Sequence, residues 1–436
     1  MPKSFEWYLD FVDLKHKPAE DELIAIFRVK PANGISLEEA AGRIASESSI
    51  GTWTTLTTMT KELRCLMAKA YEIKPDGIVK IAYPVRLFEE GNMPQILSSI
   101  AGNVFGMRAI KCLRLEDVIF PRELLKSFRG PQFGIKGVRD KLKIYNRPIT
   151  LTVPKPKVGL DAEIYAKVAY EILSGGVDLL KDDENLTSQS FNRFEKRLSA
   201  TMKVIDKVEK ETGERKGYLV NVTAETREMI RRAKLVADYG NEFIMIDIVI
   251  AGWSALQTMR EVAEDYKLAI HAHRAFHAAF TRNPDHGMSM FVLAKIARII
   301  GVDHIHIGTP RVGKMEAKTR EVLEIQKAIT STTYEPDKED EIHMKQEWYH
   351  IKPVFPVASG GLHPGVIPPI IKHMGIDVMI QVGGGVLGHP DGPKAGARAV
   401  RQAIEATING ISLNEYAKKH RELSRALEKW GYVVPK

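Results

Sequence analysis

The sequence predicts an α/β protein in which a C-terminal (β/α)8 TIM barrel follows an N-terminal α+β domain. Three observations support this. The chain has 436 residues, which is too long for one ordinary domain. From about residue 150 onward, short apolar runs alternate with helical segments, and polar residues follow nearly every run. We place the N-terminal domain at residues 1–130, and the barrel with a C-terminal helical extension at residues 131–436.

The barrel is predicted from eight apolar runs. Short, nearly continuous apolar runs separated by helices are typical of parallel strands that are covered on both faces. Eight such units over roughly 260 residues match the size of a (β/α)8 barrel. A doubly wound open sheet is the alternative, but no GxGxxG motif follows the first run. The runs are LTV (151–153), VDLL (177–180), GYLVNV (217–222), FIMIDIV (243–249), LAIHAH (ending at 273), DHIHI (303–307), VFPVA (354–358) and DVMIQV (377–382).

The segments between the runs have helical spacing. DAEIYAKVAYEILSGG follows the first run and stops at Gly175–Gly176. TAETREMIRRAKLVADYG follows the third, with Thr223 as the expected N-cap and Gly240 at its end. Beyond about residue 410 the chain again has a helical pattern.

The N-terminal part mixes two kinds of segment. DELIAIFRVKP and GIVKIAYPV have the composition of strands, whereas SLEEAAGRIASES and NMPQILSSIAG have helical spacing. Such a mixture predicts an α+β domain built on an antiparallel sheet.

Composition excludes several classes of function. Hydrophobic residues make up 44% of the chain and charged residues 27%, as in soluble globular proteins. No uncharged apolar stretch is long enough to span a membrane, and the N-terminus lacks the pattern of a signal peptide. Only Cys65 and Cys112 are present, so we expect no disulfide framework and a cytoplasmic location. The net charge is +8, but Lys and Arg are interleaved with Asp and Glu along the chain. This pattern favours a basic mouth that binds an anion over nucleic-acid binding.

Polar residues fall at the C-terminal ends of the runs. In a barrel these ends converge on one mouth, where barrel active sites are built. Capped strands and solvated loops would explain one or two such positions, but not the whole set. The residues are Lys155, Lys157, Lys181, Asp183, Glu184, Asn221, Asp247, His273, Arg274, His304, His306, Ser359 and Gly383–Gly385.

A magnesium site is predicted at the end of the second run. Asp183 and Glu184 supply the hard oxygen ligands that Mg2+ prefers, and Lys181 stands beside them. Two carboxylates are few for a site, so a third anionic ligand, water or substrate has to complete it. Zinc is an alternative because His-x-His occurs twice, at 271–273 and 304–306, although the oxygen ligands favour Mg2+.

Two phosphate sites and a proton acceptor are also predicted. Glycine-rich loops follow the last two runs, at 359–361 and 383–385, and glycine lets backbone N–H groups approach phosphate closely. Arg274 and His306 are candidates for a second phosphate, and His273 is a candidate base. A Gly-bounded loop, GTPRVGKMEA (308–317), has the pattern of a lid that carries Lys314 over the substrate.

Several motifs resemble, in order and spacing, the large-subunit family of ribulose-bisphosphate carboxylase/oxygenase (Rubisco). The resemblance runs from about residue 45 to about residue 410. The GLHPG after Ser359, a lid one residue longer than the plant type and a short C-terminus are similar to archaeal, small-subunit-free (form III-like) members. The motifs are ESSIGTWTT, GNVFG, GGVDLLKDDEN, HAHRAFH, DHIHIGT with VGK, PVASGGLHPG and QVGGGVLGHP.

The resemblance implies carboxylation, and oxygenation, of ribulose 1,5-bisphosphate to 3-phosphoglycerate through a Mg-stabilised enediolate. It implies that Lys181 takes up CO2 as a carbamate and binds Mg2+ with Asp183 and Glu184. Lys155 and His273 would handle substrate protons, and Lys314 would stabilise the new carboxylate. The implied substrate-binding residues are Glu47, Thr52, Trp53, Asn103, Lys157, Arg274, His306, Ser359, Gly361, Gly383 and Gly384.

The implied partners are ribulose 1,5-bisphosphate, CO2, O2 and a second copy of the chain, with no small subunit and no nucleic acid or membrane. Glu47 and Asn103 match positions that a partner subunit contributes in this family, so at least a homodimer is implied. Two alternatives stay open. One is a Rubisco-like enolase or isomerase of sulfur-sugar salvage, and the other is a barrel that binds an anion without turnover.

Overall fold

A computed structural model describes residues 6–312 and 318–433. The chain forms two compact units. The first unit comprises Met1–Gly130, Phe276–Ile300 and Ser331–Ile351, and the barrel unit comprises Pro131–Ala275, Gly301–Thr330 and Lys352–Lys436. The sequence analysis placed the domains at 1–130 and 131–436. It did not predict that the later segments 276–300 and 331–351 belong to the first unit.

The first unit is built on a five-stranded sheet with the order β10-β4-β1-β3-β2. β1 pairs antiparallel with both β3 and β4, which confirms the antiparallel sheet predicted from sequence. Ser36 begins helix α2 by accepting a hydrogen bond from the Glu39 N–H at 3.1 Å. The sheet and its helices are β1 (Glu22–Pro31), α2 (Leu37–Glu47), β2 (Lys69–Ile73), β3 (Ile78–Pro84), α3 (Met93–Ile100), β4 (Ile110–Ile119) and β10 (Gly287–Met288).

Later chain segments complete the core of the first unit. Every residue of α12 (Met290–Ile300) is buried. Its Lys295 forms an ion pair with Asp117 of β4, with 2.6 Å between Nζ and Oδ1. The remaining elements of this unit include α1 (Glu6–Leu9), α4 (Arg122–Lys126), α11 (Ala278–Thr281), β12 (Thr333–Tyr334) and β13 (Gln346–Glu347).

Eight parallel strands close into a barrel in the second unit, with the order β11-β14-β15-β5-β6-β7-β8-β9. Closure is made where Met379 of β15 pairs with Ile149 of β5, so the open-sheet alternative is wrong. Six predicted runs contain one of these strands each, and the runs at 151–153 and 177–180 overlap β5 and β6. They are β5 (Ile149–Thr152), β6 (Leu179–Lys181), β7 (Gly217–Asn221), β8 (Phe243–Asp247), β9 (Ala269–His273), β11 (His304–His306), β14 (Phe355–Ala358) and β15 (Met379–Gln381).

One end of the barrel is closed by apolar packing. Residues of several strands form a buried cluster, and α5 (Gly134–Leu142) adds Val138 and Leu142 to it. Burial of this apolar area stabilises the N-terminal end of the barrel, and the polar residues are left at the C-terminal end. The strand residues of the cluster are Ile149, Leu151, Leu179, Leu219, Phe243, Met245, Ala269, Phe355, Val357 and Met379.

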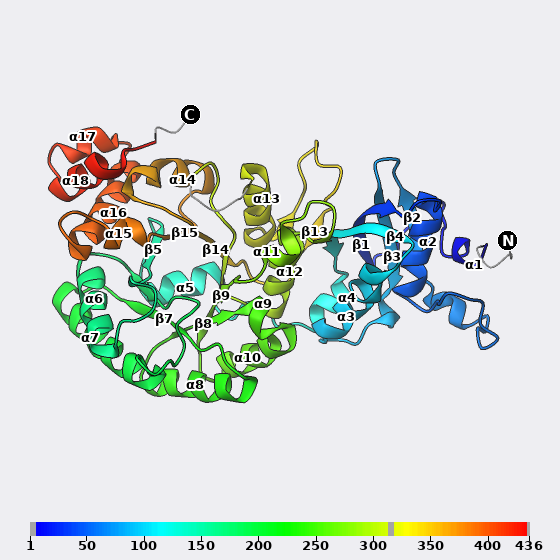
Figure 1. The fold of residues 1–436 in the computed structure, drawn as a ribbon, viewed down its shortest axis with the longest axis horizontal. Helices are drawn as coiled ribbons and strands as arrows, with labels where there is room; N and C mark the ends of the chain where they lie inside the picture. The colour runs from blue at the N-terminus through cyan, green and yellow to red at the C-terminus, as the bar shows by residue number, and fades with distance from the viewer. Residues whose placement is uncertain (1–5, 313–317, 434–436) are drawn as a thin grey trace. The chain divides into compact units, whose positions relative to one another are not determined.

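Helices alternate with the barrel strands, and α6, α7, α8 and α10 follow one another around one side of it (Figure 1). α6 ends at Ser174 with Gly175 as its C-cap, which confirms the predicted stop. The N-cap of α8 is Glu225, not Thr223, because the Thr223 hydroxyl instead accepts the Asp247 N–H at 2.9 Å. The helices of this unit include α6 (Ala162–Ser174), α7 (Phe194–Thr212), α8 (Thr226–Asp238), α10 (Trp253–Asp265), α13 (Thr319–Thr330), α14 (Ile367–Met374), α16 (Pro393–Ile408), α17 (Leu413–Ala417) and α18 (Arg421–Trp430).

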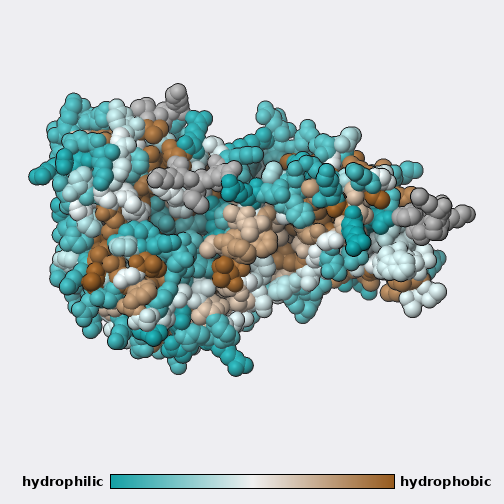
Figure 2. All heavy atoms as spheres, in the orientation of Figure 1, coloured by the Kyte–Doolittle hydropathy of each residue, from teal (hydrophilic) through white to brown (hydrophobic). Residues whose placement is uncertain are grey.

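Hydrophilic residues cover much of the visible face of the molecule, with hydrophobic residues gathered in smaller areas (Figure 2). Within the part of the chain that the structure describes, no helix has the length and apolar character needed to cross a membrane.

Candidate active site

The end of β6 presents a buried amine to the barrel mouth. The Lys181 side chain is fully buried, and its Nζ donates a hydrogen bond to the Asp182 carbonyl at 2.8 Å. Burial lowers the pKa of Lys181, because removing the ammonium from water costs more than the nearby acids, Glu184 foremost, return. Lys181 therefore tends toward a neutral amine, which is a nucleophile.

Asp183 lies beside this amine as a carboxylate. Its Oδ2 accepts a hydrogen bond from Lys155 Nζ at 2.9 Å, and its Oδ1 accepts one from the Asn185 amide at 3.0 Å. Burial works to raise the pKa of Asp183, but these two partners outweigh it and the pKa is lowered. Glu184 is half-buried, and its backbone carbonyl accepts a hydrogen bond from Asn221 Nδ2 at 3.2 Å. The ends of β5, β6 and β7 therefore meet at this point.

Asp182 lies in a network that sequence analysis missed. Its carboxylate accepts hydrogen bonds from the hydroxyls of Tyr165 and Tyr218, both at 2.6 Å. It also accepts the Asn221 N–H at 2.9 Å and pairs with Arg197 Nη2 at 3.1 Å. Successive strand residues point to opposite faces, so Lys181 and Asp183 face the mouth while Asp182 is anchored behind them. The run Lys181–Glu184 contains three acids, and the predicted site used only two of them. The alternation of side chains along a strand could have indicated that the third acid, Asp182, points away from the mouth.

His273, at the end of β9, lies between two acids. Its Nδ1 is 2.9 Å from Asp247 Oδ1, and its Nε2 is 3.7 Å from Glu184 Oε2. The neighbouring Arg274 is partly buried, and burial lowers its pKa to about 10, so the guanidinium stays charged at neutral pH. The predicted base and the predicted cation thus share the mouth with the acids of β6.

His306, at the end of β11, contacts the loop that follows β14. Its Nδ1 is 2.9 Å from Ser359 Oγ, and its Nε2 is 2.9 Å from His271 Nε2. His271 in turn contacts His304, with 3.4 Å between the two Nδ1 atoms. His271 of the first His-x-His pair therefore contacts both histidines of the second pair. No group of three or more His, Cys, Asp or Glu side chains within residues 6–312 and 318–433 is arranged to hold a metal ion, so this arrangement gives the zinc alternative no support.

The glycine loops differ in how much space they leave. A Cβ at Gly384 would meet nothing within 4 Å, and one at Gly383 would meet only Lys155 Cε at 3.7 Å. A Cβ at Gly385 would lie 2.5 Å from the Leu362 carbonyl oxygen, so this glycine is required for packing. Gly360 and Gly361 both adopt positive φ, at 113° and 75°. Gly383 and Gly384 thus leave open backbone beside Lys155.

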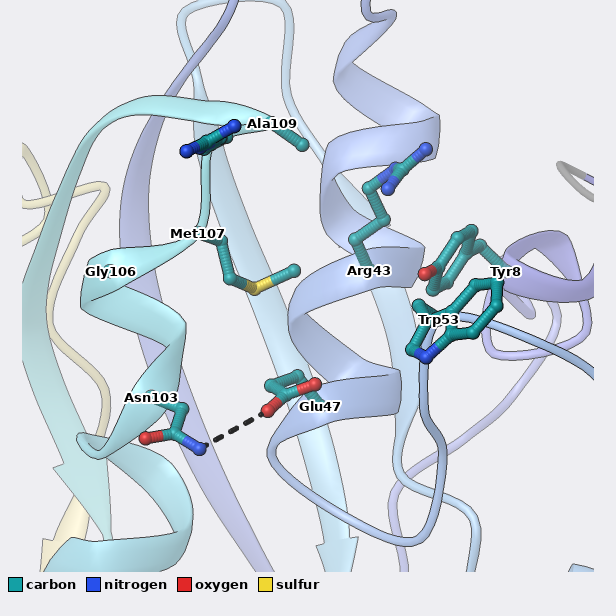
Figure 3. Close-up of a pocket in the computed structure, with 9 residues that line it drawn as sticks. Tyr8, Arg43, Glu47, Trp53, Asn103, Gly106, Met107 and Ala109 are labelled. Carbon is teal, nitrogen blue, oxygen red and sulfur yellow. Dashed lines mark hydrogen bonds between the residues drawn. The ribbon is translucent and has the colours of Figure 1, made fainter.

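Some predicted residues are not in this cluster. Lys157 is exposed in the loop after β5, and Lys314 lies outside the described residues. Four others belong to the first unit, where Asn103 Nδ2 donates to Glu47 Oε1 at 3.4 Å (Figure 3). Glu47 and Trp53 line a hollow of about 450 Å³ there, with Tyr8, Arg43, Asn103, Gly106, Met107, Arg108 and Ala109. Trp53 is 77% exposed, and Trp7 Nε1 donates to the Thr52 carbonyl at 3.2 Å.

A closed (β/α)8 barrel with a lysine, acids and histidines gathered at the C-terminal ends of its strands defines the class of this protein as a barrel enzyme. Comparison with known proteins gives the family. Residues 134–430 match the catalytic domain of the ribulose bisphosphate carboxylase large chain, and residues 10–124 match its N-terminal domain. The chain belongs to the Rubisco large-chain family.

Relatives and solved structures support the same family. The chain is 58% identical over 434 residues to the ribulose bisphosphate carboxylase of Pyrococcus abyssi, covering 99% of this chain and 98% of that one. It is 55% identical over 438 residues to that of Archaeoglobus fulgidus, covering 99% of each. The dimeric archaeal Rubisco from Hyperthermus butylicus is similar, with a TM-score of 0.94, 64% identity and coverage of 98% of this chain and 100% of that one. The octameric Rubisco from Pyrococcus horikoshii has a TM-score of 0.92 and 56% identity, covering 98% of this chain and 97% of that one.

Proposed function

We propose that this enzyme carboxylates ribulose 1,5-bisphosphate to 3-phosphoglycerate, with oxygenation of the same substrate as a competing reaction. The observation that carries the proposal is the fully buried amine of Lys181 beside Asp183, at the mouth of a barrel of this family. Membership of the family supports the reaction class, and the arrangement of the mouth supports the roles given below.

Lys181 is the residue that would be activated by CO2. A neutral amine attacks the carbon of CO2, forms a nitrogen–carbon bond and releases one proton, which leaves an anionic carbamate. Burial favours the neutral amine that this step needs. The carbamate would give the Lys181 side chain an anionic oxygen ligand, which the two neighbouring carboxylates lack for a complete site.

The donor set at this position fits Mg2+. Asp183 and Glu184 supply carboxylate oxygens and carbamylated Lys181 would supply a third, all of the hard type that Mg2+ prefers. Mg2+ bound there would polarise the carbonyl of the sugar bisphosphate. Lys155 Nζ, 2.9 Å from Asp183 Oδ2, holds that carboxylate in place and reaches the same space.

Proton transfer falls to His273 and Lys155. The C3 proton of the sugar has to leave so that the resulting enediolate can attack CO2 through C2. His273 is held by Asp247 at 2.9 Å with its other nitrogen toward Glu184. That arrangement fixes the ring orientation that a base requires. Lys155 supplies a second amine at the same mouth, and Lys314 of the lid would face the carboxylate that forms.

The bisphosphate would be held at two ends. Gly383 and Gly384 offer open backbone to one phosphate, which Gly361 would also bind. Arg274 with Ser359 and His306 would hold the other phosphate. Thr52, Trp53, Glu47 and Asn103 belong to the first unit, and we propose that a second copy of the chain contributes them. The functional assembly is then at least a homodimer without a small subunit, in the cytoplasm.

The test is a carboxylation assay. The purified protein is incubated with bicarbonate and Mg2+, ribulose bisphosphate and labelled CO2 are added without oxygen, and acid-stable 3-phosphoglycerate is counted. We expect product from the native enzyme and none from Lys181→Met, which keeps the length of the side chain but lacks the amine. Lys203→Ala, at an exposed lysine of α7, is the matched control and should keep full activity.

A second measurement reports on Lys181 directly. With 13C-labelled CO2 and Mg2+, the native protein should show a carbamate carbon resonance that Lys181→Met lacks. Absence of 3-phosphoglycerate while the bisphosphate binds would overturn the proposal. In that case release of solvent-exchangeable substrate protons would indicate an enolase or isomerase, and binding without any exchange would indicate an anion-binding barrel.

A further inference from the structure

Three buried histidines and one serine form a continuous hydrogen-bonded chain across strands β9, β11 and β14. His304 Nδ1 lies 3.4 Å from His271 Nδ1, His271 Nε2 lies 2.9 Å from His306 Nε2, and His306 Nδ1 lies 2.9 Å from Ser359 Oγ. His304 and His271 are fully buried, and His306 is 1% exposed. The chain starts in the barrel core and ends at the mouth, and the proposed function uses only its last two members.

All three imidazoles are neutral at neutral pH. Burial lowers the pKa of His304 to about 3 and lowers the pKa of both His271 and His306 well below 6.5. A neutral imidazole carries one N–H and one lone pair, so it donates from one nitrogen and accepts at the other. The nitrogen that carries the proton on one ring therefore determines which nitrogen carries it on the next ring. Only two arrangements are consistent, with every hydrogen bond donated either toward Ser359 or toward His304.

The inner end of the chain favours one direction. His304 Nε2 is buried and has no hydrogen-bond partner among the described residues, and the ring is flanked by Phe243 and Phe355 at centroid distances of 6.1 and 6.5 Å. In the inward direction, each group donates toward the barrel core, from Ser359 through His306 and His271 to His304. His304 Nε2 would then carry an N–H without an acceptor. In the outward direction it carries only a lone pair, and buried donors without acceptors are rarer in proteins than under-satisfied acceptors.

The outer end favours the same direction. A phosphate oxygen accepts hydrogen bonds and does not donate them, so Ser359 serves it only when its O–H is free to point outward. In the outward direction His306 donates to Ser359 Oγ, and the hydroxyl proton is left for the substrate. In the inward direction the hydroxyl proton is used on His306. The argument at this end rests on the proposed function.

We propose that His304 and His271 are positioning residues that fix the N–H of His306 on Nδ1, so that Ser359 donates its hydroxyl to an anionic oxygen of the substrate. His304 donates from Nδ1 to His271, His271 donates from Nε2 to His306, and His306 donates from Nδ1 to Ser359. Because both nitrogens of His306 are occupied, the contribution to the phosphate site that we propose for His306 is made through Ser359.

Nitrogen NMR tests the direction without any need for catalysis. In deuterated protein with 15N-labelled histidine, long-range correlations show which ring nitrogen carries the proton, and His306→Gln identifies the signals of His306. We expect the proton on Nδ1 of His306 and on Nε2 of His271 in the native protein. A proton on Nε2 of His306 would overturn the proposal even if the enzyme makes 3-phosphoglycerate. Conversely, an inactive enzyme with the expected tautomers would overturn the proposed function alone.

A pair of variants at His271 separates donation from packing. In His271→Gln, the side-chain amide can donate to His306 in place of the ring Nε2–H, whereas His271→Leu offers no donor. We expect KM for ribulose bisphosphate to rise about three- to tenfold in His271→Leu, the effect of losing one neutral hydrogen bond, with kcat within about twofold. His271→Gln should restore most of the affinity. Equal KM values in the two variants, or a loss confined to kcat, would contradict the positioning role.

Discussion

Arg197 of α7 is the residue whose loss we expect to cost the barrel the most stability. Its guanidinium is completely buried and pairs with the buried Asp182 at 3.1 Å. It also donates to the Thr187 carbonyl at 2.7 Å and to the Asn192 carbonyl at 3.1 Å. Burial works to lower the pKa of Arg197, but Asp182 outweighs it and the pKa is raised, so the guanidinium stays charged. The substitution to test is Arg197→Met, which keeps most of the volume and removes the charge.

The expected loss of stability depends on the hydrogen-bond donors that Asp182 retains in the variant. Removing one partner of a buried ion pair costs about 3–5 kcal/mol, because the other charge is left without compensation. Tyr165, Tyr218 and the Asn221 N–H still donate to Asp182, which favours the lower end of that range. The carbonyls that lose their donor add to the cost. We therefore expect a loss of about 3–5 kcal/mol, or a fall in Tm of about 6–20 °C at about 2–4 °C per kcal/mol.

The assay is thermal unfolding of the native and variant proteins at equal concentration, because assembly of subunits makes Tm depend on concentration. Arg215→Met is the matched control. Arg215 is 42% exposed and pairs with Glu209 and Glu242 at the surface, so its loss should cost less than about 1 kcal/mol. If Arg197→Met lowers Tm no more than Arg215→Met does, the buried pair does not stabilise the barrel as argued.

Three further predictions follow from single positions. Gly385→Ala should lower the free energy of unfolding by about 1–3 kcal/mol, because its Cβ would meet the backbone of residues 362–363, whereas Gly384→Ala should leave Tm unchanged and raise KM for the bisphosphate. His304 stays neutral in the native protein down to about pH 3, while the unfolded chain takes up its proton below about pH 6.5. Stability is therefore lost as pH falls through that range, and His304→Leu should show a shallower fall of Tm with pH between these values. Lys155→Met should reduce kcat by about 100- to 10,000-fold yet change Tm little, because the lysine side chain is 37% exposed; an unchanged kcat would remove this residue from the chemistry.

The eight strands could be predicted because their signal is local. A strand buried on both faces has to be apolar along its length, and a polar residue at its end has to reach solvent or a ligand. Lys181, Asp183 and His273 were selected in this way, and the structure gathers them with Lys155 at one mouth. The cap of α8 was predicted wrongly because Thr223 has a tertiary partner, the Asp247 N–H, which no local pattern reveals.

The sequence by itself determined the strand order along the chain, the end of the barrel that carries polar groups and the family. Only the tertiary structure decided how buried polar groups satisfy one another. Asp182 meets Tyr165, Tyr218 and Arg197 from three elements, and His271 meets His304 and His306 from a neighbouring strand. A buried charge or imidazole requires partners at hydrogen-bond distance. Which residues supply them depends on barrel closure and strand register, because these bring together side chains that lie far apart in the chain.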